Sequence, residues 1–303
     1  MKKVSVLIPT YHSEATLTRA IDSALKQSYP NVEVIVVDDN DPKDAFRKST
    51  EALMADYFGD ARVKYVKHDH NKNGAAARNT AFRNSIGDYI TFLDDDDFYY
   101  ESKIESQVNY LEEHPNLGGC YCWRHQNGVD ICGMYSGDLT FEILSMKFTP
   151  TTPCIMIKRE CFETLNGFDE SYRRHQDYEF LLRYFKKYEL EPVPTVQVEI
   201  STNGVNNAPK GQKLIELKEH FFSQFQNEID EIYLADKRMG EKIYLNHFVR
   251  TFKDLLRYGY PKLAFFVYRK YRRKCGHLFL PFFVRLLIAG RYKAITGKNL
   301  NIN

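Results

Sequence analysis

The chain has no long hydrophobic run, no evident export signal and no dinucleotide-binding glycine motif. No stretch of 18 uncharged apolar residues occurs in its 303 residues, so we expect no membrane-spanning helix. Only "MKK" at the start resembles a signal peptide, and the apolar run after it is short, so we expect no export. No G-x-G-x-x-G follows the first apolar run, which argues against a dinucleotide-dependent dehydrogenase.

The six cysteines are few, and their spacing does not indicate a metal site. Cys120, Cys122 and Cys132 lie near His125, but C-x-C is not a usual zinc spacing. Buried thiols are the favoured interpretation. Without an export signal they predict a cytoplasmic protein, either free or peripheral on the inner face of the cell membrane.

Acidic residues are absent after Asp254. Residues 206–303 carry 19 Lys and Arg against 8 Asp and Glu, a net charge of +11, whereas residues 1–205 carry 23 against 32, a net charge of −9. The total of +2 hides this asymmetry. It predicts an acidic part that handles a metal ion and a basic part that meets an anionic partner.

At 43% hydrophobic and 27% charged residues, the composition is typical of a folded globular chain. Apolar runs predict strands at 4–9, 32–39, 63–68 and 88–97, and helical periodicity predicts helices at 13–29, 44–58, 74–85 and 101–114. This alternation predicts a parallel α/β sheet with helices on both faces. Further elements are expected as a strand and helix over 152–165, a helix within 167–188, a strand at 193–201, a linker at 201–213 and helices over 214–258.

Four consecutive aspartates, Asp94–Asp97, end the fourth predicted strand. Two unit charges a few Å apart repel by roughly 4 kcal/mol at an effective dielectric of ~20. Either a solvated acidic turn or a cation site explains them. Alternate residues of an extended chain point to one side, so Asp94 and Asp96 can converge on Mg²⁺ or Mn²⁺. Polar clusters at 10–12 and 38–41 also follow strands, and open α/β sheets bind ligands at that edge.

Two further clusters carry candidate chemistry. Gly74 at a turn, with Arg78 in the first turns of the following helix, suits a phosphate or a base carbonyl. Asp177, next to Gln176 and ahead of an apolar helical face, is either a helix cap or a general base.

Neighbouring polar residues receive other interpretations. Glu179 and Asp169 compete with Asp177 for the role of general base, and Asp169 has the alternative of organising its own loop. His68 and His70 lie in a polar loop and are interpreted as solvated.

Four stretches together resemble family 2 glycosyltransferases of the GT-A fold. They are "VSVLIPTYHSEATLTRAIDSALKQSYPNVEVIVVDDN", "NGAAARNTAF", "GDYITFLDDDDFY" and "GFDESYRRHQDYEFLLR", in the family's order and spacing. The resemblance covers residues 1 to about 200. It implies a Rossmann-like, mostly parallel sheet flanked by helices, with 1–205 as the catalytic domain and 206–303 as a helical, basic extension.

The resemblance also implies roles for individual residues. The residues that would bind the donor are Pro9, Thr10, Tyr11, Asp39, Gly74, Arg78, Asp94 and Asp95. Asp96 and Asp94 would bind the metal ion, and Asp177 would be the catalytic residue. Within this set, Asp39 would accept from the uracil imide N–H and Asp95 would face the ribose. Gln176 departs from the family's usual Glu, which removes a negative charge beside the proposed base. His12 replaces a frequent Asn, which we expect to matter little.

The implied activity is inverting transfer of a hexose or N-acetylhexosamine from a UDP-sugar to an acceptor hydroxyl, with Mn²⁺ or Mg²⁺. The acceptor would belong to cell-surface polysaccharide, lipopolysaccharide or lipid-linked oligosaccharide biosynthesis. A sugar nucleotidyltransferase and an inactive nucleotide-sugar-binding protein remain as alternatives.

The basic, aromatic segment "YRKYRRKCGHLFLPFFVRLLIAGRYK" lies outside the resemblance. Its bases and apolar residues suit an anionic membrane surface, or its apolar face packs on the catalytic domain or a second subunit. Nucleic acid is not an expected partner, because a basic aromatic tail alone is no recognised binding module.

Overall fold

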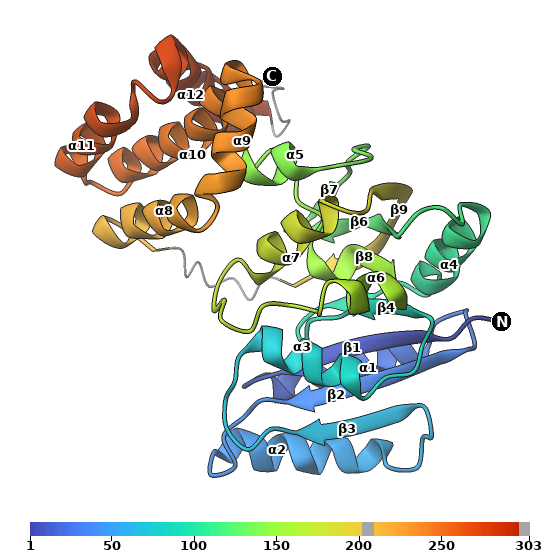
Figure 1. Cartoon of the computed structure of the whole chain (residues 1–303). Coiled ribbons are helices and arrows are strands. Elements are labelled where there is room, and N and C mark those ends of the chain that lie inside the picture. Colours follow the sequence, from blue (N-terminus) through green and yellow to red (C-terminus); the bar gives the residue numbers. More distant parts are fainter. Residues whose placement is uncertain (202–208, 297–303) are drawn as a thin grey trace. The chain divides into compact units, whose positions relative to one another are not determined.

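The computed structural model describes residues 1–201 and 209–296, which form two compact units (Figure 1). The first unit holds residues 1–140 and 150–201, and the second holds 141–149 and 209–296. Segment 141–149 therefore packs with the C-terminal helices, which its place in the sequence did not indicate. Most of the predicted linker at 201–213 lies outside the described residues. The domain boundary between 205 and 206 stays a prediction.

The first half of the sheet is parallel, as predicted. It contains β1 (Val4–Thr10), β2 (Val32–Asp38), β3 (Val63–Lys67) and β4 (Tyr89–Phe92), in the spatial order β3-β2-β1-β4. β1 pairs with β2 and with β4, and every strand in this half runs the same way. Their carboxyl ends therefore meet at one edge.

The second half of the sheet makes it mixed. It contains β5 (Phe98–Tyr99), β6 (Gly119–Gln126), β7 (Val129–Ile131), β8 (Ile155–Lys158) and β9 (Leu190–Ile200). The order continues β8-β6-β9-β5, with β7 paired to β6. β8 is antiparallel to β4 and to β6, whereas β6 and β9 are parallel. The sequence did not predict β5, β6 or β7.

Helices cover both faces of this sheet. The helices are α1 (Glu14–Leu25), α2 (Ala45–Met54), α3 (Gly74–Arg83), α4 (Lys103–Glu113), α6 (Arg159–Thr164) and α7 (Gln176–Phe185), with short 3-10 turns at Ala55–Tyr57 and Thr152–Cys154. Helices α1, α2 and α4 supply residues to one buried cluster. Phe82 of α3, Phe162 of α6 and Phe180 of α7 belong to an aromatic group on the other face.

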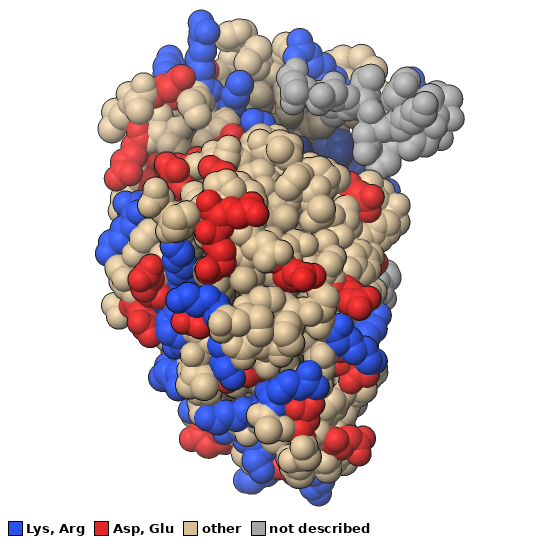
Figure 2. All heavy atoms as spheres, turned by 90° about the vertical axis from the view of Figure 1, so that its right-hand side faces the viewer, with Lys and Arg blue, Asp and Glu red and all other residues tan. Residues whose placement is uncertain are grey.

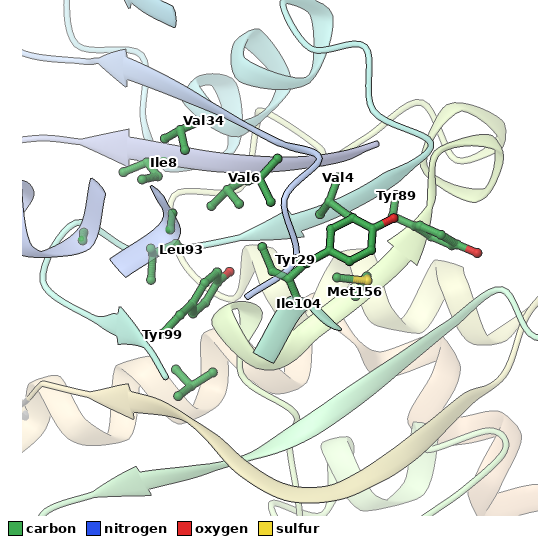
Figure 3. Close-up of a cluster of buried hydrophobic side chains, with 14 of the residues drawn as sticks. Val4, Val6, Ile8, Tyr29, Val34, Tyr89, Leu93, Tyr99, Ile104 and Met156 are labelled. Carbon is green, nitrogen blue, oxygen red and sulfur yellow. The ribbon is translucent and has the colours of Figure 1, made fainter. Parts of the chain in front are cut away.

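The first buried cluster follows from alternation along β1. Val4, Val6 and Ile8 point to the same side and pack with Val34 of β2, as Figure 3 shows. Ile104 of α4 closes the cluster from the helical layer. Because each of these side chains is nearly inaccessible to solvent, this face holds β1 rigidly in the middle of the sheet.

The second unit is helical, as predicted for the C-terminal part. Its elements are α5 (Thr140–Leu144), α8 (Gln212–Gln224), α9 (Gln226–Ala235), α10 (Lys237–Arg257), α11 (Pro261–Tyr271), the 3-10 turn Gly276–Leu278 and α12 (Phe279–Thr296). On α10, His247 and Asn246 bond to the backbone carbonyls of Leu144 and Ser145. No helix in the described part of the chain is long and apolar enough to cross a membrane.

Candidate functional site

The carboxyl ends of β1, β2 and β4 bring three polar segments together. Thr10 at the end of β1 pairs with Asp38 at the end of β2, and Asp39 N donates to Thr10 O at 2.9 Å. Leu93 N donates to Leu7 O, so the acidic segment leaves the sheet beside β1. This is the edge at which open α/β sheets bind ligands.

A pocket of about 270 Å³ opens at this edge. Nine of the ten site residues proposed from the sequence line it: Pro9, Thr10, Tyr11, Asp39, Gly74, Arg78, Asp94, Asp95 and Asp96, with Ala77 completing the lining. The tenth, Asp177, does not line it, but its neighbour Gln176 contacts Arg78. The structure thus brings distant parts of the sequence into one pocket, since Pro9 and Asp96 are 87 positions apart.

The Asp39 carboxylate is buried and fully engaged by the protein. Its Oδ1 accepts from His68 Nδ1 at 2.6 Å and from Lys72 N at 2.8 Å. Its Oδ2 accepts from Asn73 N at 2.9 Å and from Asn71 Nδ2 at 3.0 Å. A carboxylate offers about four acceptor positions, so the side chain holds the loop 68–73 in place. A uracil imide would have to displace one of these donors.

His68 is not solvated, contrary to the sequence interpretation. Its ring is buried between Asp39 and Thr80, with Nε2 2.9 Å from Thr80 Oγ1. Both ring nitrogens therefore have a hydrogen-bond partner. His70, by contrast, is exposed. The polar loop gave no sign that one histidine supports the sheet edge.

Helix α3 presents Arg78 to the pocket. Asn73 caps the helix by accepting from Ala75 N and Ala76 N. Arg78 Nη2 lies 2.5 Å from Asp94 Oδ1 and Nη1 donates to Gln176 Oε1 at 3.2 Å. Its Nε is buried and has no hydrogen-bond partner among the described residues. Because Arg78 also lines the pocket, its guanidinium is placed to face an anionic ligand there.

Gly74 leaves the space that this pairing needs. A Cβ at this position would lie 3.2 Å from Arg78 Nη1 and 3.3 Å from Gln176 Oε1. Those separations are tighter than ordinary contacts, so a larger residue would push Arg78 and Gln176 apart. Glycine at the first helical position is thus explained by the neighbouring side chains.

The four aspartates form a turn rather than a continued strand. β4 ends at Phe92, and Asp97 N donates to Asp94 O at 3.1 Å. The expectation that Asp94 and Asp96 alternate along an extended chain is therefore wrong. The cause is this four-residue turn, with Asp95 and Asp96 at its centre. Asp95 Oδ2 accepts from Tyr11 N at 3.0 Å, which ties the turn to the end of β1.

Burial makes these carboxyl groups hard to ionise. Burial raises the pKa of Asp95 to about 6. Burial and the nearby Asp94 charge raise the pKa of Asp97 to about 8, and the same two causes raise the pKa of Asp96. Two arginines act against this trend, since Arg78 pairs with Asp94 and the Arg19 charge partly opposes the rise in the pKa of Asp96.

These residues fit a divalent cation. Asp94, Asp95 and Asp96 bring hard carboxylate oxygens to one pocket, where burial and the Asp94 charge raise the pKa of Asp95 and of Asp96, and a divalent cation would favour the ionised forms. Within the described ranges, no three His, Cys, Asp or Glu residues are arranged as a complete metal site. This is compatible with Mg²⁺ or Mn²⁺ chemistry, in which one or two carboxylates act together with substrate phosphates and water.

We expect the metal-free protein to lose stability as the pH rises from about 4 to about 8. Folded Asp97 keeps its proton up to pH about 8, whereas an unfolded Asp releases it near 3.8, so the folded state binds more protons in this window. Asp97→Asn keeps an acceptor for Ser201 N and abolishes the titration. In thermal melts with EDTA, we expect the wild-type Tm to fall between pH 5 and 8.5 by at least roughly 2–4 °C more than that of the variant. Equal falls would contradict the assignment.

Asp177 lies in the first turn of α7 and is half-buried. Burial raises the pKa of Asp177, and the nearby Arg78 charge partly opposes that rise. A carboxylate with a raised pKa is a stronger base toward a hydroxyl proton. The Gln176 contact with Arg78 fixes the start of α7 relative to the pocket.

Two site-supporting residues were missed in the sequence. Arg19 of α1 donates to the carbonyl of Asp96 and to Ser201 Oγ, and its guanidinium lies 4.9 Å from the centre of the Phe98 ring. Ser201 N donates to Asp97 Oδ1 at 2.8 Å. Both residues hold the acid turn from outside the pocket. An arginine on the exposed face of a helix and a serine after a strand carry no signal that could have revealed this.

Comparison with known proteins places the chain in a family. The family "Glycosyl transferase family 2" matches residues 5–164, more than half of the chain, and the chain belongs to that family. An uncharacterized glycosyltransferase of Haemophilus influenzae is 28% identical over 284 residues, which cover 82% of this chain and 90% of that protein.

A second relative and a solved structure carry more specific names. WfgD of Escherichia coli, a UDP-Glc:α-D-GlcNAc-diphosphoundecaprenol β-1,3-glucosyltransferase, is 37% identical over 108 residues, 36% of this chain and 40% of its own. The mannosyltransferase PcManGT of Pyrobaculum calidifontis, solved with GDP-Man and Mn²⁺, has a TM-score of 0.60 at 18% identity and covers 98% of this chain and 88% of its own. The fold is GT-A with C-terminal helices, as predicted.

Proposed function

We propose that this glycosyltransferase moves a hexose or N-acetylhexosamine from a UDP-sugar to a hydroxyl of a lipid-linked or polysaccharide acceptor, with inversion at the anomeric carbon. The observation that carries the proposal is the pocket in which the Arg78 guanidinium lies beside the acid turn and contacts Asp94. That pairing suits a diphosphate held beside a cation. The name of WfgD supports the donor and the acceptor class.

In the proposed reaction, the acceptor oxygen forms a bond to the anomeric carbon as the bond from that carbon to the diphosphate breaks on the opposite face. Asp177 takes the proton of the attacking hydroxyl. Arg78 balances the charge that grows on the departing UDP. Asp96 and Asp94 would hold Mn²⁺ or Mg²⁺, which supplies further positive charge to the diphosphate. Tyr11 and the loop 68–73 would contact the nucleoside, with Asp95 toward the ribose.

A screen of nucleotide sugars tests this proposal. We expect a UDP-sugar to release UDP in the presence of Mn²⁺ or Mg²⁺, and EDTA to lower the rate by roughly a hundredfold or more because several kcal/mol of charge stabilisation are lost. Asp96→Asn should require more metal for half-maximal rate, and Lys43→Gln, on an exposed loop, should not.

Other products would reject specific parts of the proposal. Release of GDP from a GDP-sugar would overturn the choice of uridine, and PcManGT makes this the first donor to compare. Pyrophosphate as the product would indicate a nucleotidyltransferase. Binding of UDP without turnover of any donor would indicate an inactive binding protein. The cytoplasmic location and a homo-oligomer stay predictions.

A further inference from the structure

We propose that α11 and α12 form a docking surface for an anionic phospholipid membrane, with an apolar row that enters the interface and a basic hollow that binds lipid phosphate. The inference goes beyond the proposed reaction, because it concerns binding that needs neither donor nor acceptor. It rests on residues of the second unit alone.

Helix α12 is apolar on two sides. On its packed side, Phe279 and Phe283 lie against Phe252 of α10, with ring centres 5.5 and 4.9 Å apart. On its other side, an apolar row stays about half exposed: Leu280 (52%), Val284 (51%), Leu287 (47%) and Ile288 (55%). These positions follow the i, i+4, i+7, i+8 spacing of one helix face. A helix that only covers a protein core would have polar residues there.

A basic hollow borders this apolar row. It measures about 330 Å³ and is lined by Tyr268, Arg272, Arg273, Gly276, His277, Phe279 and Leu280. Leu280 belongs to both the hollow and the row, so the two features adjoin. The chain turns sharply here at Gly276, whose φ is +62°. Two arginines over one hollow suit a phosphate group, because a guanidinium binds phosphate oxygens in pairs.

The positive charge of this surface is only partly neutralised within the described residues, where Glu241 lies beside Gly276 of the hollow. Lys270 pairs with Glu219 at 2.6 Å. Arg269, Arg272 and Arg273 form no ion pair in the part of the chain that the structure describes, and all three are exposed. No acidic residue follows Asp254, whereas eleven Lys and Arg do. Lys and Arg side chains of this unit project at the top of the face drawn in Figure 2.

Charge and chemistry select the occupant. A second copy of the chain in a two-fold dimer would bring two positively charged surfaces together, which repels. Nucleic acid would gain nothing from the exposed aliphatic row of α12, because single strands stack on aromatic side chains. An anionic bilayer matches both features, since basic groups contact headgroups while leucine and isoleucine enter the acyl boundary. The proposed contact is peripheral, and no helix in the described part of the chain is long and apolar enough to cross a bilayer.

Co-sedimentation of the full chain with vesicles tests this inference. The vesicles contain phosphatidylcholine with 30% phosphatidylglycerol. One comparison uses vesicles of pure phosphatidylcholine, and the other uses inorganic phosphate without vesicles. We expect wild type to pellet with the anionic vesicles only, and less as salt increases. Arg272→Gln/Arg273→Gln should weaken binding by roughly tenfold to thirtyfold. Val284→Gln/Leu287→Gln/Ile288→Gln should weaken it by roughly a hundredfold.

Matched controls separate this surface from general effects. Lys43→Gln/Lys48→Gln removes two exposed bases of the first unit, and Phe58→Gln/Ile86→Gln removes two exposed apolar side chains there. Both controls should pellet like wild type, and circular dichroism and melting confirm that every variant is folded. The inference is overturned if wild type does not pellet, or if the α12 variants pellet as controls do. A vesicle-free dimer that the triple variant dissociates would assign the row to a second copy instead.

Discussion

Asp177→Asn is expected to lower kcat by roughly 10²–10⁴-fold while leaving the affinity for the nucleotide nearly unchanged. Asparagine preserves the size of the side chain but cannot accept the acceptor proton. Asp177 does not line the donor pocket, so UDP should still bind. Because burial raises the pKa of Asp177, the wild-type rate should rise with pH through that pKa, and the variant should lose this limb. Steady-state kinetics and calorimetric titration with UDP measure both quantities.

Asp169→Asn is the matched control for this variant. Asp169 was a competing candidate for the base, but its carboxylate accepts from Ser171 N at 2.9 Å within its own loop. The hydrogen bonds from Ser171 lower the pKa of Asp169, so that Asp169 is a weaker base than Asp177. We expect near-normal kcat for the control. Near-normal turnover of the Asp177 variant, or an equal loss in both, would show that the base is elsewhere.

Asp39→Asn is expected to lower the free energy of unfolding by about 3 kcal/mol, because it disturbs a buried acceptor of several charge-assisted hydrogen bonds. An amide can accept at one oxygen only, so its NH₂ group would face either the donors on Oδ1 or those on Oδ2. The loop 68–73 should loosen, and UDP affinity should fall as a consequence. Denaturant titration and calorimetry with UDP give the two values.

The relation between the two losses separates two roles for Asp39. Loss of UDP affinity with an unchanged free energy of unfolding would support the direct uracil contact that the resemblance implies. Loss of both would support positioning of the loop. Asp41→Asn is the control, since Asp41 is exposed and its carboxylate accepts a local hydrogen bond from Lys43 N. Its effect on stability should stay within about 0.5 kcal/mol.

The parallel half of the sheet could be predicted because its signals are local. β1 and β2 are continuous apolar runs, and the helix between them has regular apolar spacing. The polar residues that follow those strands had to share an edge once the strands were parallel. Pro9, Asp39 and Asp94 could therefore be placed together from the sequence before any contact was known.

The mixed half could not be predicted, because long-range partners decide it. The segment "GCYCWRHQ" becomes β6 by pairing with β8 and β9, and its mixture of polar and aromatic residues has no clear period. The burial of His68 likewise depends on Asp39, 29 positions earlier. The predicted alternation of side chains along Asp94–Asp97 was wrong because it assumed an extended chain, whereas this segment forms a turn.

The long-range contacts that complete the site have a consequence for how the chain folds. Two contacts that complete the acid turn and the base, Ser201 with Asp97 and Gln176 with Arg78, join residues 104 and 98 positions apart. Contacts of such separation cost loop entropy before they add stability, so they form slowly. The pairing of β1 with β2 joins residues that are much closer in the sequence, such as Val4 and Val32, and the addition of β4 needs no residue beyond Phe92. During refolding, the sheet edge should therefore exist before the enzyme can act, and activity should return later than the parallel sheet.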